Sequence, residues 1–273
     1  MKLEFTKMSG AGNDFVVLDN RAESIRDKPG LAKRLCDRHW GVGADGLLLV
    51  EKSSRGADYR MEYYNADGSY GGMCGNGGRC IAVYAVHRGI ASPNHRFDAL
   101  DHMYEAKVKG AEVVLKMKDP KDLRLNFVLR LAGGDISAHY VDTGAPHVVV
   151  EVPGELNDVD VVGLGRSIRE HSNFKPGGTN VNFLKILGDK SLQIRTYERG
   201  VEAETLACGT GSIASAIIAG SLGKAKPPVG VMVRSGSTLK VDFDAEGDGK
   251  IRNVRLSGPA VTVFEGTIEF REN

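Results

Sequence analysis

The sequence predicts a mixed α/β protein of the α+β class, built from two similar halves. Short segments of alternating apolar and polar residues, typical of half-buried strands, outnumber the helical segments. A Cys-Gly-polar-Gly motif occurs twice, at Cys74 and at Cys208, about half a chain length apart. Each motif runs into an apolar, alanine-containing segment that is typical of a helix. We therefore expect a duplication in which each half carries one thiol at a helix N-terminus.

The expected strands are short and dominate the chain. The clearest ones are expected at residues 15–18, 58–64, 112–117, 191–197 and 238–243. The last of these strands and residues 250–256 form an expected hairpin, because the connection ends in Asp248 and Gly249, a favourable turn pair.

Helices are fewer, and we expect them at residues 29–39, 78–87, 161–171 and 211–222. Pro29 suits the first turn of its helix, since proline lacks the amide hydrogen that a first turn leaves unpaired. A charged, proline-containing stretch at residues 118–122 marks the boundary between the halves. No long flexible linker follows it.

The composition limits the classes of protein and partner. Of 273 residues, 41% are apolar and 26% are charged, which are values of a globular protein with a packed core. A net charge of +1 gives no reason to expect nucleic acid or an anionic membrane as partner. The sequence shows neither a signal peptide nor a membrane span. With four cysteines and no export signal, we expect reduced thiols and a cytoplasmic location.

The two cysteine motifs have a structural and a chemical interpretation. Cysteine is often a small buried residue, which is how we interpret Cys36 and Cys80. Core packing does not demand repeated glycines before repeated helices, however. A helix N-terminus offers unpaired amide donors and positive potential, which favour a thiolate and can also hold a carboxylate.

Three weaker patterns do not predict a cofactor or a metal. Residues 209–214 match a dinucleotide fingerprint, but a clear βαβ unit and the acidic residue that follows it are missing. Residues 242–253 resemble a calcium loop, but the last position is Asn253 instead of glutamate. Cys36 and His39 have the spacing of half a zinc site, without a second half.

Several polar residues lie in glycine-rich turns or near strand ends. Each alone is more often a residue that satisfies backbone groups. Together with two activated thiols, they form the recognition set expected for a small zwitterionic ligand. They are Asn13, Asn65, His147, Asn180, Glu198 and Arg199.

The motifs resemble those of the diaminopimelate epimerase family over almost the whole chain. They are found, in that family's order, at residues 12–15, 64–69, 73–80, 197–200 and 207–211. Asn76 favours this family, since related proline racemases usually carry histidine there. The resemblance implies a cofactor-independent two-base isomerase that interconverts LL- and meso-diaminopimelate, a precursor of lysine and peptidoglycan.

The resemblance also implies an architecture. It consists of two pseudo-symmetric domains, each a curved, mainly antiparallel sheet around a central helix, with the active-site cleft between them. Residues 261–270 would return to the first domain, so that the domains are residues 1–118 plus 258–273 and residues 119–257. A homodimer is implied, with Phe264 at the place of an aromatic dimer contact.

For the site, the resemblance implies that Cys74 and Cys208 exchange the α-proton on opposite faces of one carbon. His147 and Glu198 would tune the pKa values of the thiols. Two positions depart from the family pattern: Gly46 replaces a ligand-contacting glutamine, and Ala145 replaces an asparagine. The implied substrate-binding residues are Asn13, Asn65, Gly75, Asn76, Asn180, Glu198, Arg199, Gly209 and Thr210.

Two other functions compete with this one. A proline or hydroxyproline racemase-like enzyme would use the same pair of thiols on another substrate. A redox-sensing or structural thiol pair would belong to a different class, although the chain contains no C-x-x-C motif.

Overall fold

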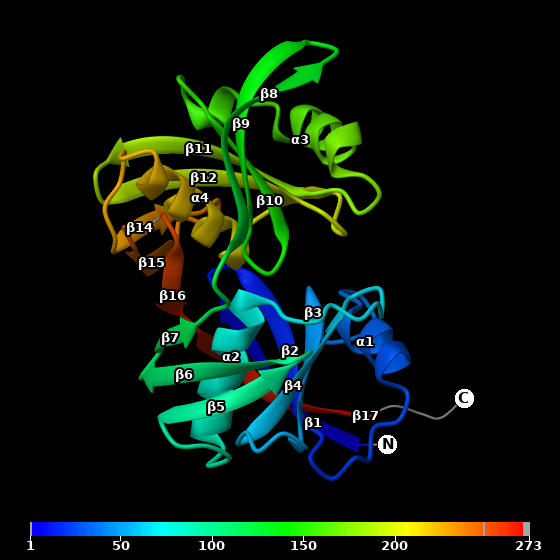
Figure 1. Ribbon diagram of the computed structural model, residues 1–273. Coiled ribbons are helices and arrows are strands. Elements are labelled where there is room, and N and C mark those ends of the chain that lie inside the picture. The colour runs from blue at the N-terminus through cyan, green and yellow to red at the C-terminus, as the bar shows by residue number, and fades with distance from the viewer. Residues whose placement is uncertain (1, 248, 270–273) are drawn as a thin grey trace. The chain divides into compact units, whose positions relative to one another are not determined.

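The computed structural model describes residues 2–247 and 249–269 (Figure 1). The chain forms two compact units, the first made of residues 1–116 and 257–273 and the second of residues 117–256. Strands predominate over helices in both units, so the predicted mixed α/β class is confirmed.

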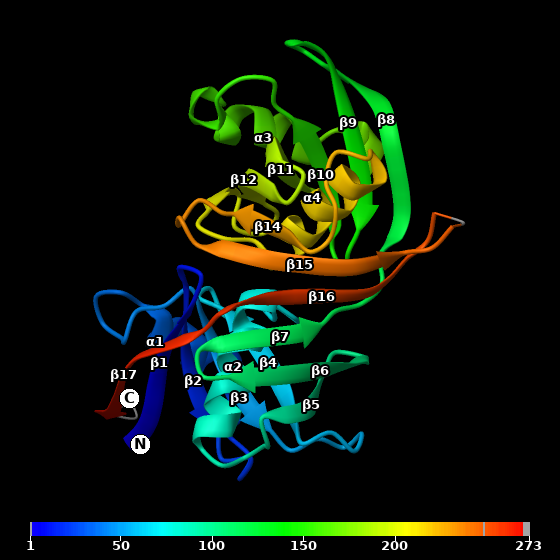
Figure 2. The ribbon, with the colours of Figure 1, turned by 90° about the vertical axis from the view of Figure 1, so that its left-hand side faces the viewer.

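The first unit is one sheet with a helix in its centre. Its elements are β1 (Lys2–Gly10), β2 (Asn13–Asp19), α1 (Lys28–Cys36), β3 (Gly46–Glu51), β4 (Tyr59–Asn65), α2 (Gly75–His87), β5 (Asn94–Ala99), β6 (His102–Lys109), β7 (Glu112–Lys116) and β17 (Val261–Glu269). The pairs β2–β3 and β4–β5 are parallel, and their connections contain α1 and α2. The other pairs are antiparallel, and Figure 2 shows β5, β6 and β7 side by side.

The second unit repeats this plan. Its elements are β8 (Lys121–Leu131), β9 (Gly134–Asp142), β10 (Pro146–Glu151), η1 (Leu156–Asp158), α3 (Val161–Arg169), η2 (Ser172–Phe174), β11 (Asn180–Gly188), β12 (Ser191–Glu198), β13 (Ala203–Thr205), α4 (Gly209–Ser221), β14 (Val229–Met232) and β15 (Thr238–Ala245). Here β10–β11 and β12–β14 are the parallel pairs, and their connections contain α3 and α4. Strand β16 (Ile251–Pro259) then leads into the first unit.

The order of strand pairing is the strongest sign of duplication. From β1 to β6 the pairs are antiparallel, parallel, antiparallel, parallel and antiparallel. The run β9, β10, β11, β12, β14 and β15 gives the same order. Helices α2 and α4 occupy the same place in each run, and each contacts most strands of its own sheet.

The central helices are buried on nearly all sides. In α2 every residue from Gly75 to Ala85 is buried, and most of α4 is buried too. A helix enclosed by a curved sheet needs small and apolar residues all round, which explains the glycines and alanines. No helix of the described residues is long and apolar enough to cross a membrane.

All four expected helices exist, but their ends differ from the expectation. Helix α1 ends at Cys36 and α3 at Arg169, earlier than expected. Helices α2 and α4 begin earlier, at Gly75 and Gly209. Glycine is a weak helix former, but burial inside the sheet overrides that propensity here.

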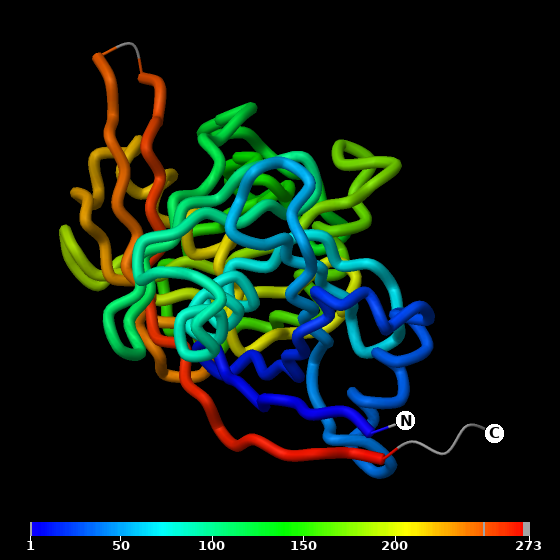
Figure 3. Tube along the Cα trace, turned by 90° about the horizontal axis from the view of Figure 1, so that it is seen from below, coloured from blue at the N-terminus to red at the C-terminus, as the bar shows by residue number. Residues whose placement is uncertain are grey.

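The last described strand lies beside the first one. Strand β17 pairs antiparallel with β1, from Lys2 opposite Glu269 to Ser9 opposite Val261. Figure 3 shows these terminal strands running side by side. Phe270, the last residue of the expected C-terminal strand, lies outside the described residues.

The expected hairpin near residue 248 is described except at its tip. Strands β15 and β16 flank the turn, and the amide of Glu246 donates to the carbonyl of Lys250 over 2.9 Å. In the segment that resembles a calcium loop, the side chain of Asn253 donates to the carboxylate of Asp244 over 2.8 Å. Asp248 itself lies outside the described residues.

Candidate active site

The first thiol site consists of Asn13, Cys74 and Asn76, all in the first unit. Cys74 is the N-cap of α2, with an extended backbone at φ −119° and ψ 127°. Its Sγ lies 3.7 Å from Oδ1 of Asn13, a distance and direction suited to donation by the thiol. Nδ2 of Asn76 donates to the same oxygen over 3.4 Å.

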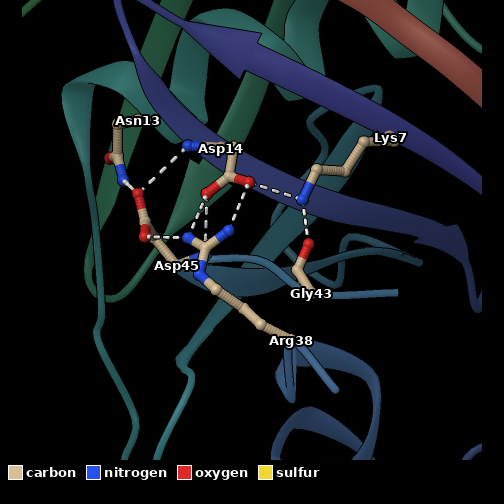
Figure 4. Close-up of polar contacts among 6 residues, drawn as sticks. All are labelled: Lys7, Asn13, Asp14, Arg38, Gly43 and Asp45. Atoms are coloured by element: carbon tan, nitrogen blue, oxygen red, sulfur yellow. Dashed lines mark hydrogen bonds and ion pairs between the residues drawn. The ribbon is translucent and has the colours of Figure 1, made fainter. Parts of the chain in front are cut away.

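Charged groups fix the orientation of both asparagine amides. Nδ2 of Asn13 donates to Asp45 over 2.7 Å (Figure 4). This contact turns its Oδ1 toward Cys74. Oδ1 of Asn76 accepts from the guanidinium of Arg79 over 2.8 Å. Because a carboxylate only accepts and a guanidinium only donates, neither amide can be reversed without losing a hydrogen bond.

Arg79 is fully buried although it carries a charge. Its other hydrogen bonds go to the carbonyl oxygens of Gly75 and Pro259. Burial lowers the pKa of Arg79 from its usual value, and the nearby thiols of Cys80 and Cys74 act in the opposite direction. The first thiol site therefore has a buried cation bonded to Gly75 and Asn76, in the first turn of its helix.

Asp45 is held by an ion cluster that joins three segments of the first unit. Arg38 donates to Asp14 and to Asp45, over 3.2 and 2.9 Å (Figure 4). Lys7 forms an ion pair with Asp14 and donates to the carbonyl of Gly43. Burial would raise the pKa of Asp14, but the hydrogen bond and charge of Lys7, with Arg38, leave it lowered. Asp14 is thus an anion that keeps both cations in place.

Asn65 and Gly46 lie next to Tyr63. The hydroxyl of Tyr63 donates to Oδ1 of Asn65 over 2.6 Å, and Nδ2 of Asn65 donates to Ser69. A Cβ at Gly46 would lie 2.5 Å from the Tyr63 ring and 2.7 Å from the carbonyl oxygen of Tyr64. The place of the glutamine side chain implied by the resemblance is therefore occupied by an aromatic ring.

The second thiol site consists of His147, Cys208 and Thr210, all in the second unit. Cys208 is the N-cap of α4, and its backbone conformation, φ −121° and ψ 111°, is close to that of Cys74. Its Sγ accepts from the amide of Gly211 over 3.4 Å and lies 3.5 Å from Oγ1 of Thr210. The same hydroxyl lies 2.9 Å from Nε2 of His147.

His147 is a neutral imidazole. It is fully buried, and this burial, followed by the charge of Arg199, lowers its pKa to about 3. His147 therefore acts on Cys208 through its hydrogen bond to Thr210, and not through a positive charge.

The remaining predicted residues of the second unit lie at strand ends. Asn180 donates to the carbonyl of Pro146 and accepts from the amide of Arg199. The guanidinium of Arg199 donates to the carbonyl of Gly177 over 3.3 Å. Glu198 accepts from Thr205 over 2.9 Å. Asn180 thus ties the His147 strand to the loop that carries Arg199.

Ala145 occupies the position for which the resemblance implies asparagine. It is half-buried, and its carbonyl accepts from the amide of Thr143 over 3.1 Å. Its methyl group offers no hydrogen bond, so this position differs chemically from the family pattern.

The other two cysteines have no such surroundings. Cys36 and Cys80 are buried, and burial raises the pKa of each thiol to about 12. These are inert packing positions. In the part of the chain that the structure describes, no cluster of His, Cys, Asp and Glu could hold a metal ion.

Three residues with a place in these sites were missed in the sequence: Asp45, Arg79 and Asn182. Asn182 donates to Nδ1 of His147 over 3.0 Å. A signal for it existed, because Asn180 and Asn182 are two positions apart in a strand and so share a face. Asp45 gave no such signal, since its role depends on a bond to Asn13 of a distant segment. Arg79 gave none either, because its bond to Asn76 of the same helix depends on the burial of its side chain.

Comparison with solved structures defines the class of fold. A probable proline racemase from Agrobacterium radiobacter K84, solved with bound carbonate, matches with a TM-score of 0.77 at 17% identity. The match covers 99% of this chain and 93% of that one. The chain therefore has the fold of this probable racemase.

Sequence comparison gives the family. The model of the family described as diaminopimelate epimerase matches residues 5–123 and 139–262. The diaminopimelate epimerase of Chlorobaculum tepidum is 47% identical, over 96% of this chain and 99% of its own length. That of Aquifex aeolicus is 40% identical, over 97% and 98%. The chain belongs to the diaminopimelate epimerase family, and it is an isomerase.

Proposed function

We propose that the protein epimerises LL-2,6-diaminopimelate to meso-diaminopimelate by a two-base mechanism without a cofactor. The observation that carries this proposal is the repeated placement of a cysteine as the N-cap of a buried central helix, at Cys74 and Cys208. Family membership supports the substrate, because the relatives are named for this reaction.

In the proposed mechanism, one cysteine removes the α-proton as a thiolate and the other delivers a proton to the opposite face. Reversal of the direction exchanges their roles. Because one cysteine must be a thiolate while the other is a thiol, we expect the titrations of the two groups to be coupled. The mechanism requires that Cys74 and Cys208 both reach one substrate carbon.

Backbone amides at the helix N-termini stabilise the negative charge that develops in this reaction. We assign the binding of the reacting α-carboxylate to Gly75, Asn76, Gly209 and Thr210, because a helix N-terminus favours anions. The amino groups and the distal carboxylate are assigned to Asn13, Asn65, Asn180, Glu198 and Arg199. Arg199 suits a carboxylate, since its guanidinium can donate two parallel hydrogen bonds.

His147 and Glu198 are proposed to tune the thiols. His147 acts through Thr210, which it contacts over 2.9 Å. Glu198 adds negative charge at the end of β12, which would oppose a second anion nearby.

We further propose a cytoplasmic homodimer. The four cysteines are free thiols, which suits a reducing compartment. Phe264 on β17 is 47% exposed and packs edge-on against Phe5. Val261 and Val263 of the same strand are also exposed, so this strand offers an apolar surface for a second copy.

The substitutions Cys74→Ala and Cys208→Ala test the function directly. Each is expected to lower the rate of meso-diaminopimelate formation from the LL-isomer at least about a hundredfold, because each removes one proton-transfer group. Chiral chromatography of the product measures this. Cys36→Ala, the control, leaves the rate within about threefold because it changes only packing.

Either thiol variant retaining the rate of the wild type would refute the two-base assignment. A racemase of proline would instead convert proline faster than diaminopimelate in the same assay. A redox-sensing thiol pair would form a reversible disulfide and convert neither amino acid.

A further inference from the structure

Asn182 of β11 is a fully buried amide whose orientation is fixed by its neighbours. Its Oδ1 accepts from the hydroxyl of Thr196 over 3.0 Å. Its Nδ2 donates to the carbonyl oxygen of Val148 over 3.1 Å. A carbonyl oxygen can only accept, so the nitrogen of the Asn182 amide must be on the Val148 side.

This orientation determines the tautomer of His147. The same Nδ2 of Asn182 lies 3.0 Å from Nδ1 of His147. An amide nitrogen only donates, so Nδ1 must be the unprotonated acceptor. His147 is neutral, with a pKa of about 3, and therefore carries its one proton on Nε2.

The tautomer in turn sets the direction of the next hydrogen bond. Nε2 of His147 lies 2.9 Å from Oγ1 of Thr210, so the imidazole donates and the hydroxyl oxygen accepts. The hydroxyl keeps its own proton, and Sγ of Cys208 lies 3.5 Å away. The amide of Gly211 also donates to this sulfur, over 3.4 Å.

The absence of a side chain at Gly211 gives the Asn182 amide the space that it occupies. A Cβ at Gly211 would lie 2.2 Å from Oδ1 of Asn182. The glycine of the second cysteine motif is therefore matched to the buried asparagine. The first thiol site differs, because there the sulfur of Cys74 meets the acceptor Oδ1 of Asn13.

We propose that Asn182 is a positioning residue that holds His147 in the Nε2–H tautomer and so directs the Thr210 hydroxyl proton to the sulfur of Cys208. The thiolate form of Cys208 is stabilised by the two donors that result. This inference rests on the proposed function, in which Cys208 accepts and returns the α-proton. Arg199 is the charged group that acts on His147, and it acts only through its charge.

Asn182→Asp is the sharpest variant, because it exchanges a donor for an acceptor at nearly constant shape. An oxygen facing Nδ1 of His147 demands a proton there, and in a neutral imidazole Nε2 would then accept from Thr210 and withdraw its proton from Cys208. Thr210→Val removes the hydroxyl at constant shape, and Thr210→Ser keeps it. Asn173→Asp, on an exposed turn of the same unit, is the control for added charge.

Two readouts need no substrate. Nitrogen-15 NMR of the His147 imidazole reports the tautomer. The rate at which iodoacetamide alkylates Cys208, measured against pH in a Cys74→Ala background with mass spectrometry of the peptide, reports its thiolate fraction. Circular dichroism verifies that each variant folds.

We expect the Nε2–H tautomer in the otherwise unsubstituted protein and its reversal in Asn182→Asp. Loss of one hydrogen bond to a charged sulfur should slow alkylation at neutral pH about tenfold in Asn182→Asp and in Thr210→Val. Thr210→Ser and Asn173→Asp should keep the original rate.

An Nδ1–H tautomer in the unsubstituted protein, or equal alkylation in Thr210→Val and Thr210→Ser, would overturn the inference. These two results are obtained even if Asn182→Asp does not fold. If the tautomer and the alkylation rates are as expected but diaminopimelate is not epimerised, the proposed function fails and the positioning role of Asn182 stands.

Discussion

At the scale of single residues, the chain differs from the implied family pattern at Gly46, and the neighbouring Tyr63 fits this difference. The ring of Tyr63 fills the space beside Gly46, and its hydroxyl binds Asn65, an expected substrate-binding residue. The aromatic ring and the glycine are therefore complementary.

Gly46→Ala tests this close packing. The new Cβ would approach the rigid carbonyl of Tyr64 and the Tyr63 ring, so we expect the free energy of unfolding to fall by about 1–3 kcal/mol. Gly154→Ala is the control, since nothing lies within 4 Å of its Cβ position. Urea denaturation measures both. Equal stability of the two variants would show that the Tyr63 ring moves away without cost.

Part of each thiol site could be predicted from the sequence. The cysteines, Asn13, Asn76, His147 and Thr210 lie in or near glycine-rich motifs whose spacing is visible. Asp45 and Arg79 could not be found in this way, because the sequence does not show that Asp45 bonds to Asn13 of another segment or that Arg79 bonds to Asn76 of its own helix. Asn182 could have been found, because it shares a strand face with Asn180. Hydrogen-bond direction is a property of the folded chain and not of a motif.

At the scale of elements, the outer helices repeat one capping pattern, and Cys208 caps α4 in the same way by accepting from the amide of Gly211. Asp27 caps α1 by accepting from the amide of Gly30, and Asp160 caps α3 by accepting from the amide of Gly163, each over 2.9 Å. The glycine is required in both, because a Cβ would lie within 2.1 Å of the capping carboxylate. The duplication therefore extends to helix termini far from the thiols in sequence.

We expect Asp27→Ala and Asp160→Ala each to lower the free energy of unfolding by about 0.5–2 kcal/mol, since each exposes an unpaired amide at a helix start. Asp119→Ala, at an exposed position, should change it by less than about 0.5 kcal/mol. Denaturant melts of the three variants provide the comparison. Cap variants as stable as Asp119→Ala would mean that water replaces the carboxylates fully.

Helix boundaries show where prediction from local pattern ends. Glycine-rich segments were expected to precede the central helices, but Gly75 and Gly209 are already helical. The enclosing sheet supplies the stabilisation that glycine lacks, and a local pattern contains no information about it. The shift matters because it makes each cysteine an N-cap.

At the scale of the whole chain, the duplication is clearer in strand pairing than in sequence. The two sheets share one order of parallel and antiparallel pairs, whereas the sequences agree mainly at the cysteine motifs. Many apolar residues can fill the same buried position, so sequence diverges faster than pairing. The mixed α/β class and the two halves were predictable, but the pairing order was not.

Buried histidines make stability depend on pH. Burial lowers the pKa values of His95 and His139, and that of His147 to about 3. Below about pH 6.5 the unfolded chain binds protons that the folded chain does not, so stability falls with falling pH toward the folded pKa values. For His147 alone the slope approaches about 1.4 kcal/mol per pH unit.

His147→Gln should therefore show a shallower loss of stability between about pH 6.5 and about pH 4.5 than the unsubstituted protein. Urea denaturation at several pH values measures the slope. His171→Gln, which changes a histidine that is not buried, serves as the control and should keep the original slope. Identical slopes for all three proteins would contradict a neutral, buried His147.

The most direct test of the two-thiol account follows the α-hydrogen itself. Purified protein is incubated with LL-diaminopimelate in deuterated water under reducing conditions, and substrate and product are separated at low conversion. Two bases acting on opposite faces predict deuterium at the inverted α-carbon of the meso product, while the unreacted LL-isomer keeps its hydrogen. Equal deuterium in recovered substrate and product would mean that a single base serves both faces, and it would contradict the account.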